Sequence, residues 1–240
     1  MKKVGLVLTP FLAAAGAWGA FGDVIASFDA PGGNPCALAW DGQYLWCTTQ
    51  YPDYTFRIDP ADGSVVSSHA TGFGAAARGL TWADSSLYDG RYSPAYVNRR
   101  DTSGSITSSF PVNALNGGLT YDGTYFWITS TSPHTFWRYT TGGSYVSSFT
   151  VPFEPFDPGW DGTYLYCGTY QPDQSIYRLT TNGSVVESVA PPVNFPWGCC
   201  CDGEYLWVST TVGTNYIWKL DLGDIAVAPA SLGRVKAVYR

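Results

Sequence analysis

The residues best suited to chemistry stand at one recurrent place in this chain, just before five strand-like segments that otherwise repeat one another. There the repeat is broken by two acids, one arginine and three aromatic residues: Arg78, Glu154, Phe156, Asp157, Phe195 and Trp197. A cation and a carboxylate in one pocket bind groups of opposite charge, and aromatic rings supply an apolar wall. We therefore predict a site for a small polar, carbohydrate or peptide ligand. The alternative is that these positions vary because packing does not constrain them.

The two carboxylates allow a second interpretation, because a carboxyl group beside a reacting atom can act as a general acid or base. Glu154 and Asp157 are the candidates. The sequence offers no nucleophile paired with a base and no glycine-rich phosphate loop, so we assign no catalytic residue. We also predict no metal site and no cofactor, because His69 and His134 belong to no ligand-spaced motif.

A repeat of about 40 residues positions these side chains. Its clearest copy runs from Gly117 to Ser130 and reads Gly-Gly-Leu-Thr-Tyr-Asp-Gly-Thr-Tyr-Phe-Trp-Ile-Thr-Ser. The equivalents of Tyr121 in the other copies are Trp40, Trp82, Trp160 and Cys201. In each copy an apolar run precedes a turn, usually Asp-Gly, and a second apolar run follows it, which predicts a β-hairpin.

A second turn marker predicts another hairpin in each repeat. A Gly-Ser pair recurs about twenty residues after the first turn, at Gly63, Gly104, Gly143 and Gly183. Two hairpins make a four-stranded antiparallel unit, so the sequence predicts an all-β fold, a β-propeller of five such blades. Gly22 and Gly223 add two further markers, which makes six candidates for five outer strands. We therefore assign residues 23–28 as the outer strand of the fifth blade, where a strand from the N-terminus would protect an open edge.

The ends of the chain lie outside this repeat. Residues 1–19 read as a secretory signal peptide, since Lys2 and Lys3 precede an apolar stretch that ends in small residues; an uncleaved anchor is the alternative. The predicted propeller spans residues 20–222. Residues 223–240 form a C-terminal tail, in which 235–239 is a candidate extra strand. No later stretch predicts a transmembrane span, so we expect a secreted, periplasmic or cell-surface protein.

The charge of the chain argues against nucleic acid as a partner. Its formal net charge is −6 at pH 7, and Arg99 and Arg100 are the nearest approach to a basic cluster. A phosphate-binding surface needs many more clustered cations.

The six cysteines fit an oxidising compartment. Cys36 and Cys47 flank the first Asp-Gly turn and face each other if that turn has two residues; with a longer turn they fall out of register and stay free. Cys167 is the other disulfide candidate. Its partner would be Cys199 or one of the two cysteines that follow, Cys200 and Cys201, and the sequence does not choose among them.

The pattern Gly-Leu-Thr-Trp/Tyr-Asp-Gly-x-Tyr-Leu-Trp, followed by a strand and Asp-x-x-x-Gly-Ser-Val, resembles a known repeat. It is similar to that of secreted five-bladed propellers related to the glutaminyl cyclotransferases of plants and bacteria, and more distantly to NHL-type repeats. The resemblance covers residues 23–222 and implies the fold. Those enzymes carry Phe-Thr-Gln-Gly-Leu before an inner strand. Residues 76–80 here read Ala-Ala-Arg-Gly-Leu and residues 116–119 read Asn-Gly-Gly-Leu, so we carry no catalytic residue over.

Three functions remain open from the sequence. The first is a binding module that holds a ligand or an envelope protein at its loop-rich mouth. The second is an enzyme resembling the glutaminyl-peptide cyclotransferases, with Glu154 or Asp157 as acid or base. The third is a structural surface component without a site.

Overall fold

The computed structural model describes residues 19–74, 77–113, 116–170, 173–211, 213 and 215–223. The expected signal peptide before Gly19 and the tail beyond Gly223, with its candidate strand, lie outside these residues. The described part contains twenty β-strands and no α-helix. It therefore holds no helix that is long and apolar enough to cross a membrane.

Three of the sheets contain four antiparallel strands each, in sequence order. The first comprises β2 (Gly33–Trp40), β3 (Leu45–Tyr51), β4 (Tyr54–Ile58) and β5 (Val65–Ala70). The second comprises β6 (Ala77–Ala83), β7 (Ser86–Arg91), β8 (Tyr96–Arg100) and β9 (Ile106–Pro111). The third comprises β10 (Leu119–Tyr121), β11 (Tyr125–Thr131), β12 (His134–Thr140) and β13 (Tyr145–Thr150).

The remaining strands form one eight-stranded sheet in the order β1-β20-β19-β18-β14-β15-β16-β17. One antiparallel half comprises β14 (Pro155–Trp160), β15 (Leu165–Thr169), β16 (Ile176–Leu179) and β17 (Val185–Val189). The other comprises β18 (Pro196–Cys201), β19 (Tyr205–Thr210), β20 (Tyr216–Asp221) and β1 (Val24–Asp29). The two halves meet at a single parallel pair, Asp157 with Gly198.

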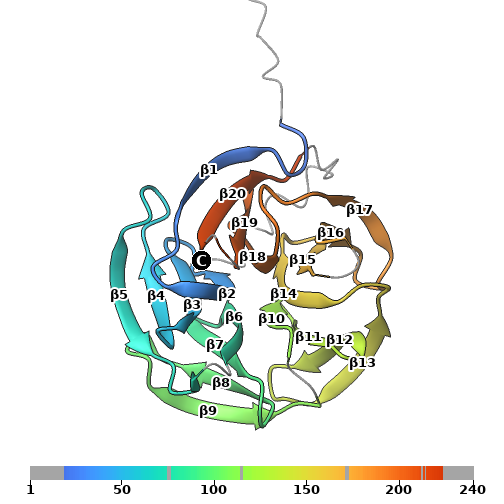
Figure 1. Ribbon diagram of the computed structural model, residues 1–240. Helices are drawn as coiled ribbons and strands as arrows, with labels where there is room; N and C mark the ends of the chain where they lie inside the picture. Colours follow the sequence, from blue (N-terminus) through green and yellow to red (C-terminus); the bar gives the residue numbers. More distant parts are fainter. Residues whose placement is uncertain are drawn as a thin grey trace, which may run out of the picture.

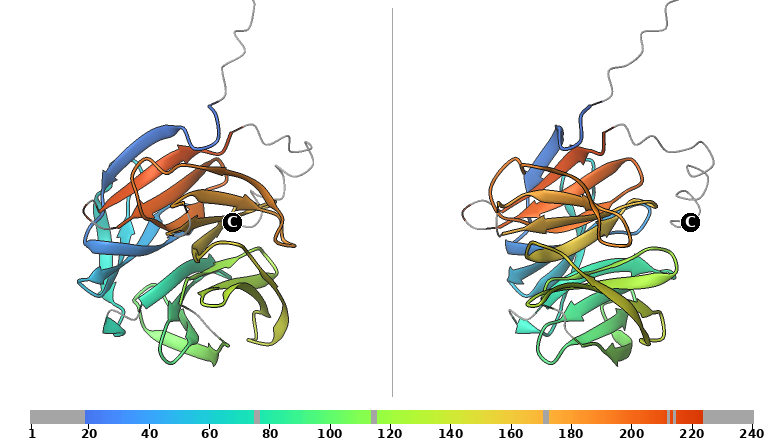
Figure 2. Two further views of the ribbon diagram at one scale, coloured as in Figure 1. Left: turned by 45° about the vertical axis from the view of Figure 1, so that its right-hand side comes forward. Right: turned by 90° about the vertical axis from the view of Figure 1, so that its right-hand side faces the viewer.

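The sheets stand around a common centre, which is the arrangement of a β-propeller (Figure 1). Strands β2, β6, β10, β14 and β18 lie nearest the centre, and β1, β5, β9, β13 and β17 lie at the periphery. Figure 2 shows the same ring from two other directions, with β1 along β20. Val24 pairs with Leu220 and Asp29 with Tyr216, so the strand expected from the Gly22 marker lies beside the last strand of the ring, as the sequence predicts.

The Asp-Gly turns are longer than the two-residue loops expected from sequence. In the first sheet Trp40 pairs with Leu45, which leaves a four-residue loop. Its glycine, Gly42, has φ +96°, a conformation that only glycine adopts without strain. The Asp41 carboxylate accepts the backbone N–H groups of Gln43 and Tyr44, at 2.9 and 2.7 Å. The aspartate therefore replaces the missing strand partners inside the loop.

The second oxygen of the same carboxylate binds a side chain of the core. Asp41 Oδ2 accepts the indole N–H of the fully buried Trp46 at 2.8 Å. Equivalent bonds run from Trp127 to Asp122, from Tyr166 to Asp161 and from Trp207 to Asp202. A buried indole N–H without a partner costs free energy. The recurring aspartate is thus required both by the turn and by the aromatic residue five positions later.

The second repeat lacks this four-residue turn. Its turn is Asp84-Ser85, both residues have positive φ (47° and 56°), and Ala83 pairs with Ser86. This is the tight two-residue loop that was expected for the Asp-Gly turns.

The outer hairpins pack each unit on its neighbour. A Cβ atom on Gly63 would lie 2.6 Å from the ring of Phe28 on β1, so only glycine fits there. The same close approach recurs between Gly104 and His69, Gly143 and Phe110, Gly183 and Phe149, and Gly22 and Val189. Each second-hairpin glycine therefore seats a side chain from the outer strand of the preceding unit.

All six cysteines are buried free thiols, which corrects the expectation of disulfides. Because the first turn has four residues, Cys47 pairs with Leu38, and a bulge between Pro35 and Ala37 removes Cys36 from the ladder. The two candidates are therefore out of register.

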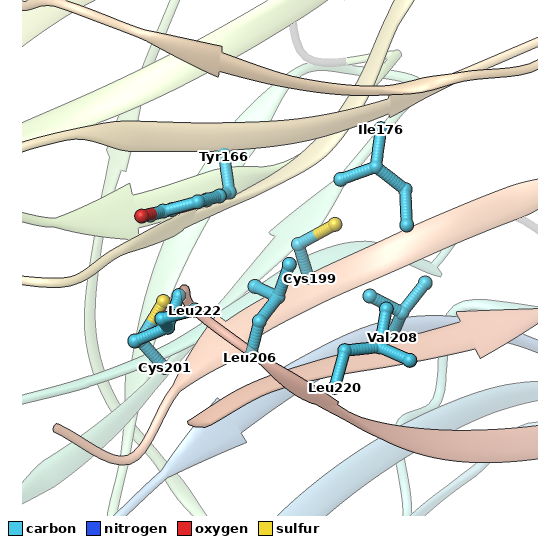
Figure 3. Packing of buried hydrophobic residues seen from close by; sticks show 8 residues of the cluster. All are labelled: Tyr166, Ile176, Cys199, Cys201, Leu206, Val208, Leu220 and Leu222. Carbon is cyan, nitrogen blue, oxygen red and sulfur yellow. The ribbon is translucent and has the colours of Figure 1, made fainter. Parts of the chain in front are cut away.

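The second disulfide candidate is not formed either, since Cys167 and Cys199 are both free. Cys199 and Cys201 lie among apolar side chains of β15, β16, β19 and β20, where they pack as small hydrophobic residues (Figure 3). Burial raises the pKa of both thiols, so they stay protonated.

Replacing Asp122 by alanine should lower the free energy of unfolding by about 2–4 kcal/mol, because two backbone N–H groups of the turn lose their shared acceptor and the Trp127 indole loses its partner. Urea unfolding at equilibrium measures the change. The matched control is Asp84→Asn in the turn that lacks this bond, for which we expect a change within about 0.5 kcal/mol. Equal losses in the two variants would contradict this account.

Candidate functional site

A cavity of about 420 Å³ opens where the inner strands begin. Its lining residues are Arg78, Tyr92, Asn116, Thr131, Glu154, Phe156, Tyr170, Phe195 and Trp197. Five of the six residues singled out from the sequence are among them. Arg78, Phe156 and Trp197 are each the second residue of an inner strand, so the radial arrangement brings them together from distant parts of the chain. We call this cavity the mouth.

Two stacked aromatic pairs form part of the wall. The rings of Phe156 and Trp197 have centroids 4.3 Å apart and are inclined by 14°. This contact follows from the backbone, because the next residues, Asp157 and Gly198, form the parallel pair between β14 and β18. The second pair, Tyr170 and Phe195, lies at 5.0 Å and 17°. The rings therefore support one another and stand as fixed surfaces.

Arg78 supplies positive charge to the mouth. The guanidinium carbon lies 5.7 Å from the ring centroids of both Tyr92 and Trp197, distances at which a cation is attracted to the aromatic faces. Nη1 also donates to the carbonyl oxygen of Ala77 at 2.8 Å. These contacts hold the guanidinium at the wall.

Glu154 supplies negative charge and is half-buried. In the part of the chain that the structure describes, its carboxylate makes no hydrogen bond and no ion pair. A partly desolvated carboxylate gains from any donor or cation that enters the cavity. The charge of Glu154 is thus available to a ligand.

Asn116 and Thr131 complete the polar wall. The backbone N–H of Thr131 donates to Asn116 Oδ1 at 2.8 Å, which ties the loop before β10 to the end of β11. Asn116 stands in one of the variable stretches noted in the sequence, whereas Thr131 ends a strand and gave no sequence signal. Tyr92 and Tyr170 come from connecting loops after β7 and β15.

Asp157 lies outside the mouth, although the sequence groups it with residues that line this cavity. It is fully buried at the centre of the ring. Its Oδ2 accepts the N–H of Leu38 at 3.1 Å and its Oδ1 the N–H of Leu119 at 3.0 Å, and the N–H of Leu80 is a third donor. These donors belong to β2, β10 and β6. Its own backbone pairs with Gly198 of β18, so one residue connects all five inner strands.

The environment of Asp157 makes it unsuited to exchange protons with a ligand. Burial raises the pKa of its carboxyl group well above the usual range, while the three backbone N–H groups act in the opposite direction. Gly118 faces it so closely that a Cβ atom would lie 2.1 Å from Asp157 Oδ1. No space for a reacting molecule remains beside this carboxylate.

A second charged group was missed in the sequence. Asp89 and Arg100 are both buried in the second sheet, and Arg100 Nε donates to Asp89 Oδ2 at 2.5 Å. The amide of Asn98 donates to Asp89 Oδ1 at 3.1 Å. The signal was present in the repeat: Asp89 and Arg100 occupy positions where the last unit has Val208 and Leu220.

Metal binding finds no support in the described residues. They contain no group of three or more histidine, cysteine, aspartate or glutamate side chains that could hold an ion.

The comparisons with known proteins identify a fold. No sequence-family model and no curated protein matches the chain. The crystal structure of glutaminyl cyclase from Myxococcus xanthus matches with a TM-score of 0.69 and 13% identity, over 84% of this chain and 97% of that one. The structure of streptogramin B lyase matches with a TM-score of 0.51 and 13% identity, over 86% and 88% of the two chains.

A third match is virginiamycin B lyase from Staphylococcus aureus, a catalytically inactive variant with quinupristin. Its TM-score is 0.51 and its identity 21%, over 78% of this chain and 66% of that one. These likenesses show a β-propeller fold, and at such identities they show the fold alone. The resemblance stated from the repeat pattern is confirmed at that level.

Replacing Asp157 by alanine should lower the free energy of unfolding by at least about 3 kcal/mol, because three buried N–H groups lose their acceptor. Urea unfolding measures the loss. The control is Asp62→Ala, which removes a bond in an exposed turn and should cost less than about 1 kcal/mol. If the two variants unfold at the same midpoint, the central role of Asp157 is wrong.

Burial raises the pKa of Asp89 to about 6, although Arg100 lowers it in part. The usual value is 3.8, so the folded state holds the proton more tightly than the unfolded chain between these two values. This contribution to stability is lost as pH rises through about 6 and recovered as pH falls. The wild type should therefore gain up to about 3 kcal/mol over Asp89→Asn between pH 7 and pH 4. Urea unfolding across this range tests the sign, and parallel curves would refute it.

Proposed function

We propose that this chain is a binding module whose mouth holds a small ligand that carries both a donor or cationic group and an acceptor or anionic group. The observation that carries the proposal is the half-buried Glu154, which has no partner in the described residues, in a cavity that also contains Arg78. A half-buried carboxylate without a partner in the described residues is available to accept hydrogen bonds. A ligand that supplies a donor or a cation would bind to it.

The size and the walls of the mouth support this proposal. A cavity of about 420 Å³ lies within the range of known ligand pockets. Fixed aromatic pairs reduce the ordering that binding requires. An amino acid, a short peptide or a sugar with polar groups at both ends has suitable chemistry.

We also propose that the ring consists of five blades. The five glycine contacts of the outer hairpins support this number, because each joins one four-stranded unit to the next. The fifth, between Gly22 and Val189, returns to the unit that contains β1. The eight-stranded sheet then consists of two neighbouring blades that approach closely enough at Asp157 to form one parallel pair.

Export to the periplasm, the cell surface or the medium is part of the proposal and depends on residues 1–19 alone. The cysteines no longer support it, since all six are free thiols.

A second candidate function is that of a glutaminyl-peptide cyclotransferase-like enzyme, favoured by the fold shared with a glutaminyl cyclase. Glu154 is then the general acid or base, because it is the carboxylate that lines the mouth, whereas Asp157 is excluded by its burial. The third function considered, a structural surface component, would leave the mouth without a ligand.

The binding function is tested with the full chain and a defined set of probes: the common L-amino acids, dipeptides, and neutral and acidic monosaccharides. Thermal shift identifies a binding probe, and calorimetry then measures its affinity for the wild type, Arg78→Ala and Glu154→Gln. We expect each substitution to weaken binding roughly 10- to 100-fold, the loss of a hydrogen bond to a charged group. His134→Ala, at an exposed position outside the mouth, is the control.

Failure of all probes, or equal loss in the control, would argue against the mouth as a binding site. The enzymatic function has a separate test, because cyclisation of an N-terminal glutamine releases ammonia. A glutaminyl tripeptide should release ammonia with the wild type and not with Glu154→Gln if the enzyme interpretation holds. Binding without ammonia release favours the module.

A further inference from the structure

The second unit buries charge at positions where the other units bury apolar side chains. Arg100 pairs across the sheet with Leu87, as Ile58 does with Leu45 and Leu220 with Leu206. Likewise, Asp89 stands where the first, third, fourth and last units have Cys47, Ile128, Cys167 and Val208. The fold is therefore compatible with an apolar pair at this place.

The ion pair is an expensive solution for stability alone. Both side chains are almost completely buried, and the desolvation of two charges can exceed their mutual attraction. The raised pKa of Asp89 has the same physical cause. Departures from a repeat that cost stability are expected where a function requires them.

Arg100 uses its remaining donors on two loops, the one at 71–74 and the turn between β8 and β9. Nη2 donates to the carbonyl oxygen of Thr71 at 2.7 Å, and Nη1 donates to that of Gly104 at 2.6 Å. The guanidinium carbon also lies 5.0 Å from the ring centroid of Phe73. Asp89 fixes the orientation of this guanidinium through Nε.

Asp53 holds the same loop from the first sheet. Its Oδ2 accepts the N–H groups of Phe73 and Gly74 at 2.9 and 2.7 Å, and its Oδ1 accepts the hydroxyl of Thr71. The N–H of Thr71 donates to the carbonyl oxygen of Asp53 at 3.1 Å. The loop 71–74 thus has its backbone and side chains fixed on both sides by charged groups.

This loop leads into the mouth. It continues through residues 75 and 76, outside the described part, into β6, whose second residue is Arg78. Arg91 at the end of β7 pairs with Ala77 and lies 5.9 Å from the ring of Phe73. The next residue, Tyr92, flanks Arg78 in the mouth.

We propose that Arg100 and Asp53 position the cationic side of the mouth, with Asp89 as the buried counter-ion of Arg100: Arg100 and Asp53 hold loop 71–74 and, through it, the guanidinium of Arg78. The inference rests on the proposed function in taking Arg78 as a ligand-binding residue. The buried ion pair then contributes to the ligand specificity of the mouth through the position of Arg78. An apolar pair would fill the same space without binding the loop.

The test removes the ion pair between Asp89 and Arg100 and keeps the propeller fold. The double variant Asp89→Asn with Arg100→Leu removes both charges, leaves an amide beside Asn98 and introduces the side chain that the last unit has at Leu220. The matched control is Asp89→Asn alone, which keeps an oxygen that can accept from Arg100 Nε and leaves the hydrogen bond from Arg100 to Thr71 in place. A second variant, Asp53→Ala, removes the bonds on the other side of the loop and leaves the core unchanged. It provides the test if the double variant does not fold.

Two readouts report on the loop and on Arg78 without a ligand. Hydrogen exchange measures the amides of Phe73 and Gly74, and peptide mass spectrometry measures the rate at which phenylglyoxal modifies Arg78. In the double variant and in Asp53→Ala, we expect both rates to rise at least several-fold. In Asp89→Asn they should remain near those of the wild type. Unchanged rates in a folded double variant or in Asp53→Ala would overturn the inference.

The third readout separates this inference from the proposed function. For a probe that binds the wild type, the double variant should lose about as much affinity as Arg78→Ala, and Arg78→Ala should add little further loss in that background. If no probe binds but Arg78 becomes more reactive, the positioning role stands and the binding function fails. If a probe binds the double variant as tightly as the wild type, the binding function stands and the positioning role fails.

Discussion

The carboxylate of Asp157 is the interaction on which the rest of the structure depends. Five inner strands converge on a centre where backbone N–H groups of β2, β6 and β10 have a side chain, and not a neighbouring strand, as their acceptor. One side chain accepts from β2, β6 and β10, and its backbone pairs with β18. Glycine at position 118 gives the approach this carboxylate needs. The same parallel pair, Asp157 with Gly198, places the preceding residues Phe156 and Trp197 side by side.

The repeat follows from a second constraint, the satisfaction of buried polar atoms at the opposite ends of the inner strands. An aspartate that serves both the turn and an indole cannot be replaced without a cost at both places. The aspartate is consequently present in four of the five copies, with an indole as its partner in three and the Tyr166 hydroxyl in the fourth. The remaining copy uses Asp84 and Ser85 in a tighter turn, buries no indole at that place, and also buries the Asp89–Arg100 pair. The second unit thus departs from the repeat both in its turn and in its buried ion pair.

Where neither constraint operates, the side chains differ from unit to unit, and these are the side chains that line the mouth. Arg78 is held against rings, whereas Glu154 remains without an internal partner in the described residues. A charge held in place by the protein defines the orientation of a ligand, and a charge left available supplies affinity. The combination suits the ligand with two polar ends that we propose.

The sequence by itself determined the all-β class, the four-stranded unit, the strand from the N-terminus beside β20 and five of the residues around the cavity, because packing imposes a period and these five residues interrupt it. Only the tertiary structure decided the register and the roles of the acids. The four-residue turn moved Cys36 and Cys47 apart, since the aspartate carboxylate holds a longer loop than Asp-Gly alone predicts. Asp157 is adjacent to Phe156 in the chain, yet alternation along a strand turns it to the centre of the ring. The bonds from Arg100 to loop 71–74 join two sheets, and no local pattern reveals such a contact.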